Sequence, residues 1–260
     1  MRKIFRRMSI FLKLIKKIKN WHLVFLVYFG FYKKSYFTLV LRNNIHVKLR
    51  TASTDIQAFV NVWIIEEYKR EGFEIKDCDI IIDIGAHVGF FALYASQYCR
   101  SGRIFCFEPI KESFDLLVEN IKMNNLTNVN CSNKAVYAQN KNVRVYLSND
   151  QAAHSIYGNG DKYIDVNAMT LSDILNTNNI KTCDLLKMDC EGSEYEIFQS
   201  TSDEYINRIQ KICLEYHIMK NDHESLHSLK NRVSSLGFQV IDVPSIQNLG
   251  MLYARKLDLS

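Results

Sequence analysis

Hydrophobic and polar positions follow a regular order from residue 79 to the C-terminus. Continuous apolar runs, which predict buried strands, are separated by stretches whose apolar residues recur every three or four positions, as in helices. This order is typical of an α/β fold in which helices cover both faces of a mostly parallel sheet. We expect strands over residues 79–85, 103–109, 129–136, 143–147, 184–189, 211–217, 237–243 and 249–255. We expect helices over residues 87–98, 111–125, 170–175, 192–200 and 222–236.

The first 50 residues follow a different pattern. A 12-residue apolar run over residues 21–32 is shorter than the roughly 20 residues that a membrane-spanning helix needs. Residues 36–41 and 45–50 predict a β-hairpin. We therefore divide the chain into an N-terminal segment, residues 1–50, and a main domain, residues 51–260. Before the apolar run, the spacing of five apolar residues among Lys and Arg predicts a basic amphipathic helix: Ile4, Met8, Phe11, Ile15 and Ile18.

Charge separates the two parts of the chain. Residues 1–50 hold 13 Lys and Arg and no Asp or Glu, whereas the other 210 residues hold 20 basic and 28 acidic residues. Residues 1–34 could contact an anionic membrane surface, pack on the main domain or contact nucleic acid, and the pattern leaves all three open. The acidic main domain argues against nucleic acid as a general partner. Seven scattered cysteines without a CxxC pair favour free thiols in the cytoplasm, with the inner face of the membrane as a second location.

The first candidate site follows the strand predicted over residues 79–85. Asp83 ends the strand, and a turn with Gly85, Ala86 and Gly89 leads into a helix. Glycines at these positions let a ligand approach the backbone and let the helix pack near the strand. The GxxxG spacing differs from the GxGxxG of a pyrophosphate-binding turn. Asp83 would repel a phosphate but suits a ligand with an amino or sulfonium group.

Two further strand ends carry acidic residues. Glu108 ends the second strand, where a carboxylate commonly accepts hydrogen bonds from the ribose hydroxyls of an adenosyl ligand. Asp189 and Glu191 flank a turn at a later strand end. Because like charges repel, their convergence favours a site for a cationic ligand, a metal or a polyhydroxylated substrate. In a simpler interpretation, Ser193 and Glu194 only cap and charge the next helix.

Several segments together resemble the FkbM family of S-adenosylmethionine-dependent methyltransferases. They are IIDIGAHVGFFALYAS, IFCFEP, NKAV, TLSDIL, LLKMDCEGSEYEIF and LEYH, and the similarity runs from about residue 53 to 255. The resemblance implies a class I methyltransferase, Rossmann-like fold with a seven-stranded sheet that ends in an antiparallel hairpin. It implies O-methylation of a hydroxyl on a sugar, glycolipid or secondary metabolite, so the expected partner is a small-molecule or glycan acceptor.

The resemblance also implies positions for S-adenosyl-L-methionine. The cofactor would lie over Gly85 to Gly89, with its ribose on Glu108 and its adenine near Asn133. Asp189 would face the methionine end or the acceptor. For the acceptor proton, the candidate bases are Asp189, Glu191 and His217, because His217 ends the strand after the Asp189 strand and a neutral imidazole is a suitable base. No complete set of metal ligands is evident, so no metal is predicted.

Three other functions compete with methyl transfer as interpretations of the sequence. Residues 223–227, HESLH, have the spacing of a zinc-peptidase helix, but no histidine follows His227 to complete a ligand set. A nicotinamide-dependent oxidoreductase is disfavoured by the missing third glycine of its turn. A catalytically silent membrane- or partner-binding protein that keeps the methyltransferase fold is the main alternative. The oligomeric state is not predicted.

Overall fold

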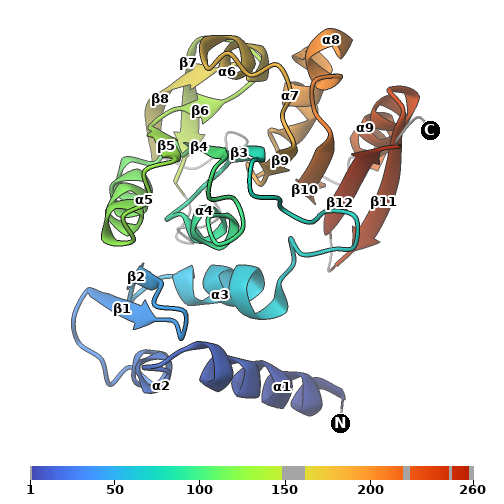
Figure 1. Ribbon diagram of the computed structural model, residues 1–260. Helices are drawn as coiled ribbons and strands as arrows, with labels where there is room; N and C mark the ends of the chain where they lie inside the picture. The colour runs from blue at the N-terminus through green and yellow to red at the C-terminus, as the bar shows by residue number, and fades with distance from the viewer. Residues whose placement is uncertain (1, 148–161, 219–222, 246–247, 258–260) are drawn as a thin grey trace.

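A seven-stranded sheet forms the centre of the fold in the computed structural model, which describes residues 2–147, 162–218, 223–245 and 248–257 (Figure 1). The strand order is β11-β12-β10-β9-β3-β4-β5. The pairings from β10 to β5 are parallel, and β12 is antiparallel to both β10 and β11. The predicted sheet with its antiparallel hairpin is therefore confirmed. The strands are β3 (Ile80–Ile84), β4 (Arg103–Phe107), β5 (Val129–Ser132), β9 (Leu185–Met188), β10 (Lys211–His217), β11 (Phe238–Pro244) and β12 (Leu249–Lys256).

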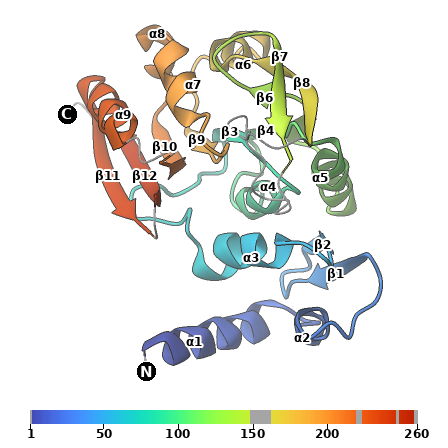
Figure 2. The same ribbon diagram turned by 180° about the vertical axis from the view of Figure 1, so that it is seen from behind.

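Helices cover both faces of this sheet, as predicted (Figures 1 and 2). Alternate residues of each strand point to opposite faces, so Ile81 packs with one hydrophobic cluster and Ile82 with the other. The Ile81 cluster includes residues of α4 (Phe90–Ala95) and α5 (Lys111–Met123). The Ile82 cluster includes residues of α6 (Leu171–Thr177), α7 (Glu194–Ser200), α8 (Asp203–Ile206) and α9 (His223–Ser235).

A smaller three-stranded sheet, in the order β6-β8-β7, differs from the prediction. The single strand expected over residues 129–136 is divided into β5 and β6 (Ala135–Val136), which belong to different sheets. The Asn133 side chain between them donates hydrogen bonds to the carbonyl oxygens of Glu108 and Pro109, which holds the bend. β7 (Asn142–Tyr146) was predicted, but β8 (Tyr163–Met169) was not, because its partly exposed residues form no continuous apolar run.

The N-terminal segment contains the predicted helix and hairpin. Its elements are α1 (Arg2–Lys17), α2 (His22–Tyr28), β1 (Tyr36–Val40) and β2 (His46–Arg50). α1 packs through buried Leu14, and Ile18 directly after the helix is also buried. The Lys17 ammonium of α1 lies 2.6 Å from the Glu66 carboxylate. No helix in the described part of the chain is long and apolar enough to cross a membrane. Contact of residues 1–34 with a bilayer surface and the domain boundary at residue 50 stay predictions.

One further helical element joins this segment to the main domain. α3 (Asp55–Val60) continues into the π-helix η1 (Asn61–Ile65). Trp63 and Ile64 of η1 are buried, and their carbonyl oxygens accept hydrogen bonds from the Lys17 and Lys13 ammonium groups of α1. The α3–η1 segment therefore lies between α1 and the central sheet (Figures 1 and 2).

Candidate functional site

Two adjoining cavities lie at the carboxyl ends of the central strands. A narrow cavity of about 70 Å³ is bordered by the ends of β3 and β4 and by β6 and β7. A larger cavity of about 530 Å³ is bordered by α3, η1, the turn after β3 and the ends of β9 and β10. Gly85, Asp189 and Glu191 line both cavities. These three residues therefore mark the junction at which one elongated ligand could occupy both spaces.

The glycine turn after β3 is pressed against the end of β9. Gly85 has a φ of 72°, and a Cβ atom there would collide with the carbonyl oxygen of Asp189. The Asp189 amide donates to the Ile84 carbonyl oxygen at 3.1 Å, which fixes the same approach. Gly89 lies at the start of α4, where a Cβ atom would lie 2.6 Å from Cδ1 of Leu117. Gly85 thus shapes the cavity junction, whereas Gly89 allows α4 to pack on α5.

The Glu108 carboxylate is held at the edge of the narrow cavity. It is only 5% exposed and accepts hydrogen bonds from the backbone amides of His87, at 2.8 Å, and Ile110, at 2.9 Å. Burial raises the pKa of Glu108 to about 7, although the two backbone hydrogen bonds act in the opposite direction. Asn133 lines neither cavity and instead holds the turn that carries Glu108.

A buried ion pair lies behind the glycine turn. The Lys187 ammonium lies 3.1 Å from Oδ1 of Asp83 and donates to the Gly85 carbonyl oxygen at 2.8 Å. Asp83 is fully buried and lines neither cavity, so it faces Lys187 and not the space expected for a ligand. Burial raises the pKa of Asp83, and the charge of Lys187 offsets part of this effect. The Asp83–Lys187 ion pair therefore holds the glycine turn in place.

Four acidic side chains lie on one side of the larger cavity, which we call the acidic wall. Glu67, Asp189, Glu191 and Glu215 all line it. Burial, followed by the charge of Asp189, raises the pKa of Glu67 to about 7 and that of Glu215 to about 9. This wall repels added negative charge and suits hydroxyl groups or cations.

His217 completes this wall. Its Nε2 lies 3.2 Å from Glu191, and its Nδ1 lies 3.7 Å from buried Glu194. Burial lowers the pKa of His217, but the neighbouring carboxylates, Glu194 first, outweigh burial and raise the pKa to about 10. The imidazole is therefore protonated at neutral pH in this setting. Glu194 also accepts a hydrogen bond from the Cys190 amide, so it closes the turn after β9.

The structure brings most of the predicted site residues together. Those that line one or both cavities are Gly85, Ala86, Glu108, Asp189, Glu191 and His217. Asp83, Gly89 and Asn133 support the surrounding turns instead.

Glu67 and Tyr68 on the acidic wall were not predicted, because they follow the α3–η1 segment and not a strand end. Lys187 was missed because a lysine in an apolar strand gives no sign of the buried acid that it pairs with.

Comparisons with known proteins agree with this architecture. A family model for the methyltransferase FkbM domain matches residues 83–240. "Methyltransferase 1" from Beauveria bassiana is 24% identical over 186 residues, which cover 63% of this chain and 74% of that protein. "Methyltransferase sdnD" from Sordaria araneosa is 24% identical over 169 residues, which cover 52% of this chain and 65% of that protein.

A solved structure extends the comparison. The crystal structure of methyltransferase FkbM from Methylobacillus flagellatus KT has a TM-score of 0.52 and 16% sequence identity, and the match covers 76% of this chain and 52% of that chain. This chain thus spans about half of that protein, and the similarity concerns the fold. The predicted class I methyltransferase fold is confirmed, and S-adenosylmethionine is the methyl donor that accords with the family match. Because the family model covers more than half of the chain, the protein belongs to the FkbM family of methyltransferases.

Proposed function

We propose that the chain methylates a hydroxyl oxygen of a small molecule or glycan, with S-adenosylmethionine as the donor. Family membership supports methyl transfer, and the acidic wall of the larger cavity supports a hydroxyl-bearing acceptor. Carboxyl groups accept hydrogen bonds from hydroxyl donors, and those that are ionised can also remove the hydroxyl proton. The gathering of four carboxylates at this wall is the observation that carries the proposal.

The junction of the two cavities is the place that we propose for the cofactor. Glu108 would accept hydrogen bonds from the ribose hydroxyls, and apolar Val136 on the same narrow cavity would contact the adenine. Gly85 leaves no room for a side chain, which lets a ligand pass close to the backbone. Glu67 in the larger cavity would pair with the ammonium group of the methionine part.

The residues at the junction would complete the reaction. Bound S-adenosylmethionine supplies an electrophilic methyl group. The protein must then align the acceptor oxygen and take its proton. Asp189 and Glu191 border both cavities, so we propose that one of these carboxylates accepts the proton. His217, protonated at neutral pH, would orient Glu191 and would not act as the base that the sequence suggested.

Transfer of a labelled methyl group tests this proposal. The full chain is incubated with S-adenosylmethionine labelled in its methyl group and with separate pools of sugars, glycolipids, phenols and amines. We expect label on a hydroxyl compound, and a loss of roughly 100-fold or more in rate for whichever of Asp189→Asn and Glu191→Gln removes the base. Asp115→Asn, an exposed carboxylate on α5, is the matched control.

Other outcomes would contradict the proposal in different ways. Label found only on amines would reject the hydroxyl acceptor and keep the methyltransferase. Binding of the donor without transfer to any pool, in a folded protein, would favour the catalytically silent alternative. Equal rates for wild type, Asp189→Asn and Glu191→Gln would reject both candidate bases.

A further inference from the structure

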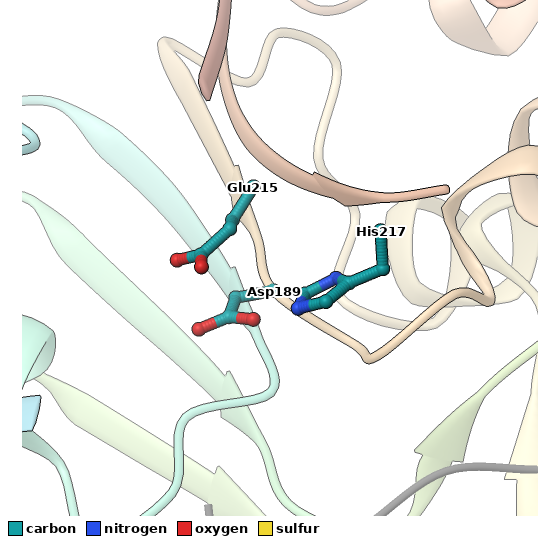
Figure 3. A group of neighbouring side chains, drawn as sticks. All are labelled: Asp189, Glu215 and His217. Carbon is teal, nitrogen blue, oxygen red and sulfur yellow. The ribbon is translucent and has the colours of Figure 1, made fainter. Parts of the chain in front are cut away.

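Three side chains on the acidic wall have the arrangement of a metal-binding group. Asp189 follows β9, and Glu215 and His217 lie on the same side of neighbouring β10, so all three converge at one point (Figure 3). One ligand atom from each side chain can be chosen so that all three lie within 4.8 Å of one another. Ligands about 2.0–2.4 Å from a shared divalent ion lie at comparable separations. No other group of three described His, Cys, Asp or Glu side chains meets this criterion.

A buried tyrosine on the same wall points independently to a polar occupant. Tyr68 is only 5% exposed and lines the larger cavity. Burial, followed by the charges of Asp189, Glu67 and Glu215, raises the pKa of its hydroxyl group well above the usual value, so the hydroxyl keeps its proton. Within the described part of the chain, this hydroxyl has no hydrogen-bond partner. The hydroxyl oxygen reaches the cavity, where an acceptor group or the water of a bound ion can form a hydrogen bond with it.

The balance of charge at this wall favours a cation. Glu67, Asp189, Glu191 and Glu215 face one cavity, and Lys187 is already occupied by Asp83 and the Gly85 carbonyl oxygen. Buried carboxyl groups destabilise the fold unless counter-charges or hydrogen bonds offset them, and the His217 ring offsets only part of their charge. A divalent ion would offset this repulsion at the point where the carboxylates lie closest together.

We propose that Asp189, Glu215 and His217 bind a divalent first-row transition-metal ion at the wall of the larger cavity. Two carboxylate oxygens and an imidazole nitrogen suit Mn²⁺, Fe²⁺ or Zn²⁺ better than the all-oxygen ions Mg²⁺ and Ca²⁺. The ion would replace the proton on one nitrogen of His217, and the carboxylate beside the other nitrogen, Glu191 or Glu194, would orient the ring. Three protein ligands leave coordination positions open for water or substrate.

The ion would give the site a defined acceptor chemistry. A hydroxyl group that coordinates a divalent ion loses its proton more readily, which suits acceptors with a hydroxyl beside a second oxygen that can chelate the ion. This role rests on the proposed function, whereas binding of the ion does not. The test therefore measures binding of the ion in the absence of any methyl donor.

Titration of the full chain, freed of metal by a chelator and dialysis, with Mn²⁺ tests the site. Free Mn²⁺ is followed by its paramagnetic resonance signal, with calorimetry on the same samples. We expect one bound Mn²⁺ per chain, and binding weaker by about tenfold or more in Glu215→Gln and in Asp189→Asn. Asp115→Asn should bind as the wild type does. Thermal unfolding of each variant without metal shows whether the fold is kept.

The possible failures are distinguishable. The site is rejected if the folded wild type binds no Mn²⁺, or if Glu215→Gln and Asp189→Asn both bind Mn²⁺ as tightly as the wild type. Glu108→Gln, outside the proposed ligand set, should bind Mn²⁺ normally, and weaker Mn²⁺ binding there would argue against this location. Failure of the proposed function would instead be seen as no binding of S-adenosylhomocysteine by the wild type, which leaves the Mn²⁺ result unchanged.

Discussion

The change from Glu108 to glutamine removes one negative charge and keeps the size of the side chain. The carboxylate accepts two backbone hydrogen bonds, from His87 and Ile110, and has further lone pairs for two ribose hydroxyls. A hydrogen bond to a charged group contributes about 1.5–3 kcal/mol, and a neutral one about 0.5–1.5 kcal/mol. Without the charge of Glu108, the two hydrogen bonds from the ribose hydroxyls weaken. The loss of binding free energy should therefore be about 2–3 kcal/mol, or roughly 30- to 150-fold in affinity.

The same carboxylate predicts a pH dependence. Burial raises the pKa of Glu108 to about 7, so the ionised form that accepts ribose hydrogen bonds is lost as the pH falls through this value. Affinity of the wild type for S-adenosylhomocysteine should fall by about tenfold between roughly pH 8 and pH 6, because that is the change in ionised fraction. The affinity of Glu108→Gln for S-adenosylhomocysteine should lack this tenfold fall, because glutamine does not ionise.

Calorimetric titration with S-adenosylhomocysteine across this pH range is the assay. Asp115→Asn on exposed α5 serves as the control for the loss of one carboxylate. Binding by Glu108→Gln within about twofold of the wild type near pH 8, where roughly nine tenths of Glu108 is ionised, would refute the ribose assignment. A wild-type affinity that stays flat while the protein remains folded would refute the role of the raised pKa.

Three further changes test the site and its support. Gly85→Ala places a Cβ atom against the Asp189 carbonyl oxygen at a positive φ, so urea unfolding should show a loss of about 2 kcal/mol or more. Lys187→Met leaves buried Asp83 without its counter-charge and should cost about 3–5 kcal/mol, much of which the double variant with Asp83→Asn should restore. Glu67→Gln should leave unfolding midpoints within a few degrees of the wild type but weaken binding of S-adenosylmethionine measurably, as calorimetry would show.

The centre of the main sheet could be predicted because β3 and β4 are almost continuous apolar runs. Ile80–Ile84 and Arg103–Phe107 are buried on both faces, which gives a signal that depends on local sequence alone. The division of residues 129–136 into β5 and β6 could not be predicted in this way. It depends on hydrogen bonds from Asn133 to a loop 24 and 25 residues away in the chain. The sequence between these residues carries no mark of that contact.

The candidate site was predictable where its residues follow strand ends. Glu108, Asp189 and Glu191 were found by this rule, because parallel strands end at the same edge of the sheet. Tyr68 was not found, because the path of the chain after η1, and not a strand, brings it to the cavity. The protonation of His217 also escaped prediction, since it depends on how closely carboxylates from separate elements approach the ring.

The measurement that tests the central claim most directly is calorimetric titration of the purified full chain with S-adenosylhomocysteine, with NAD as the control ligand. We predict one binding site per chain with a dissociation constant of micromolar order for S-adenosylhomocysteine and no binding of NAD. A folded chain that binds NAD, or that binds neither ligand, would contradict the claim that these two cavities hold the cofactor of a methyltransferase.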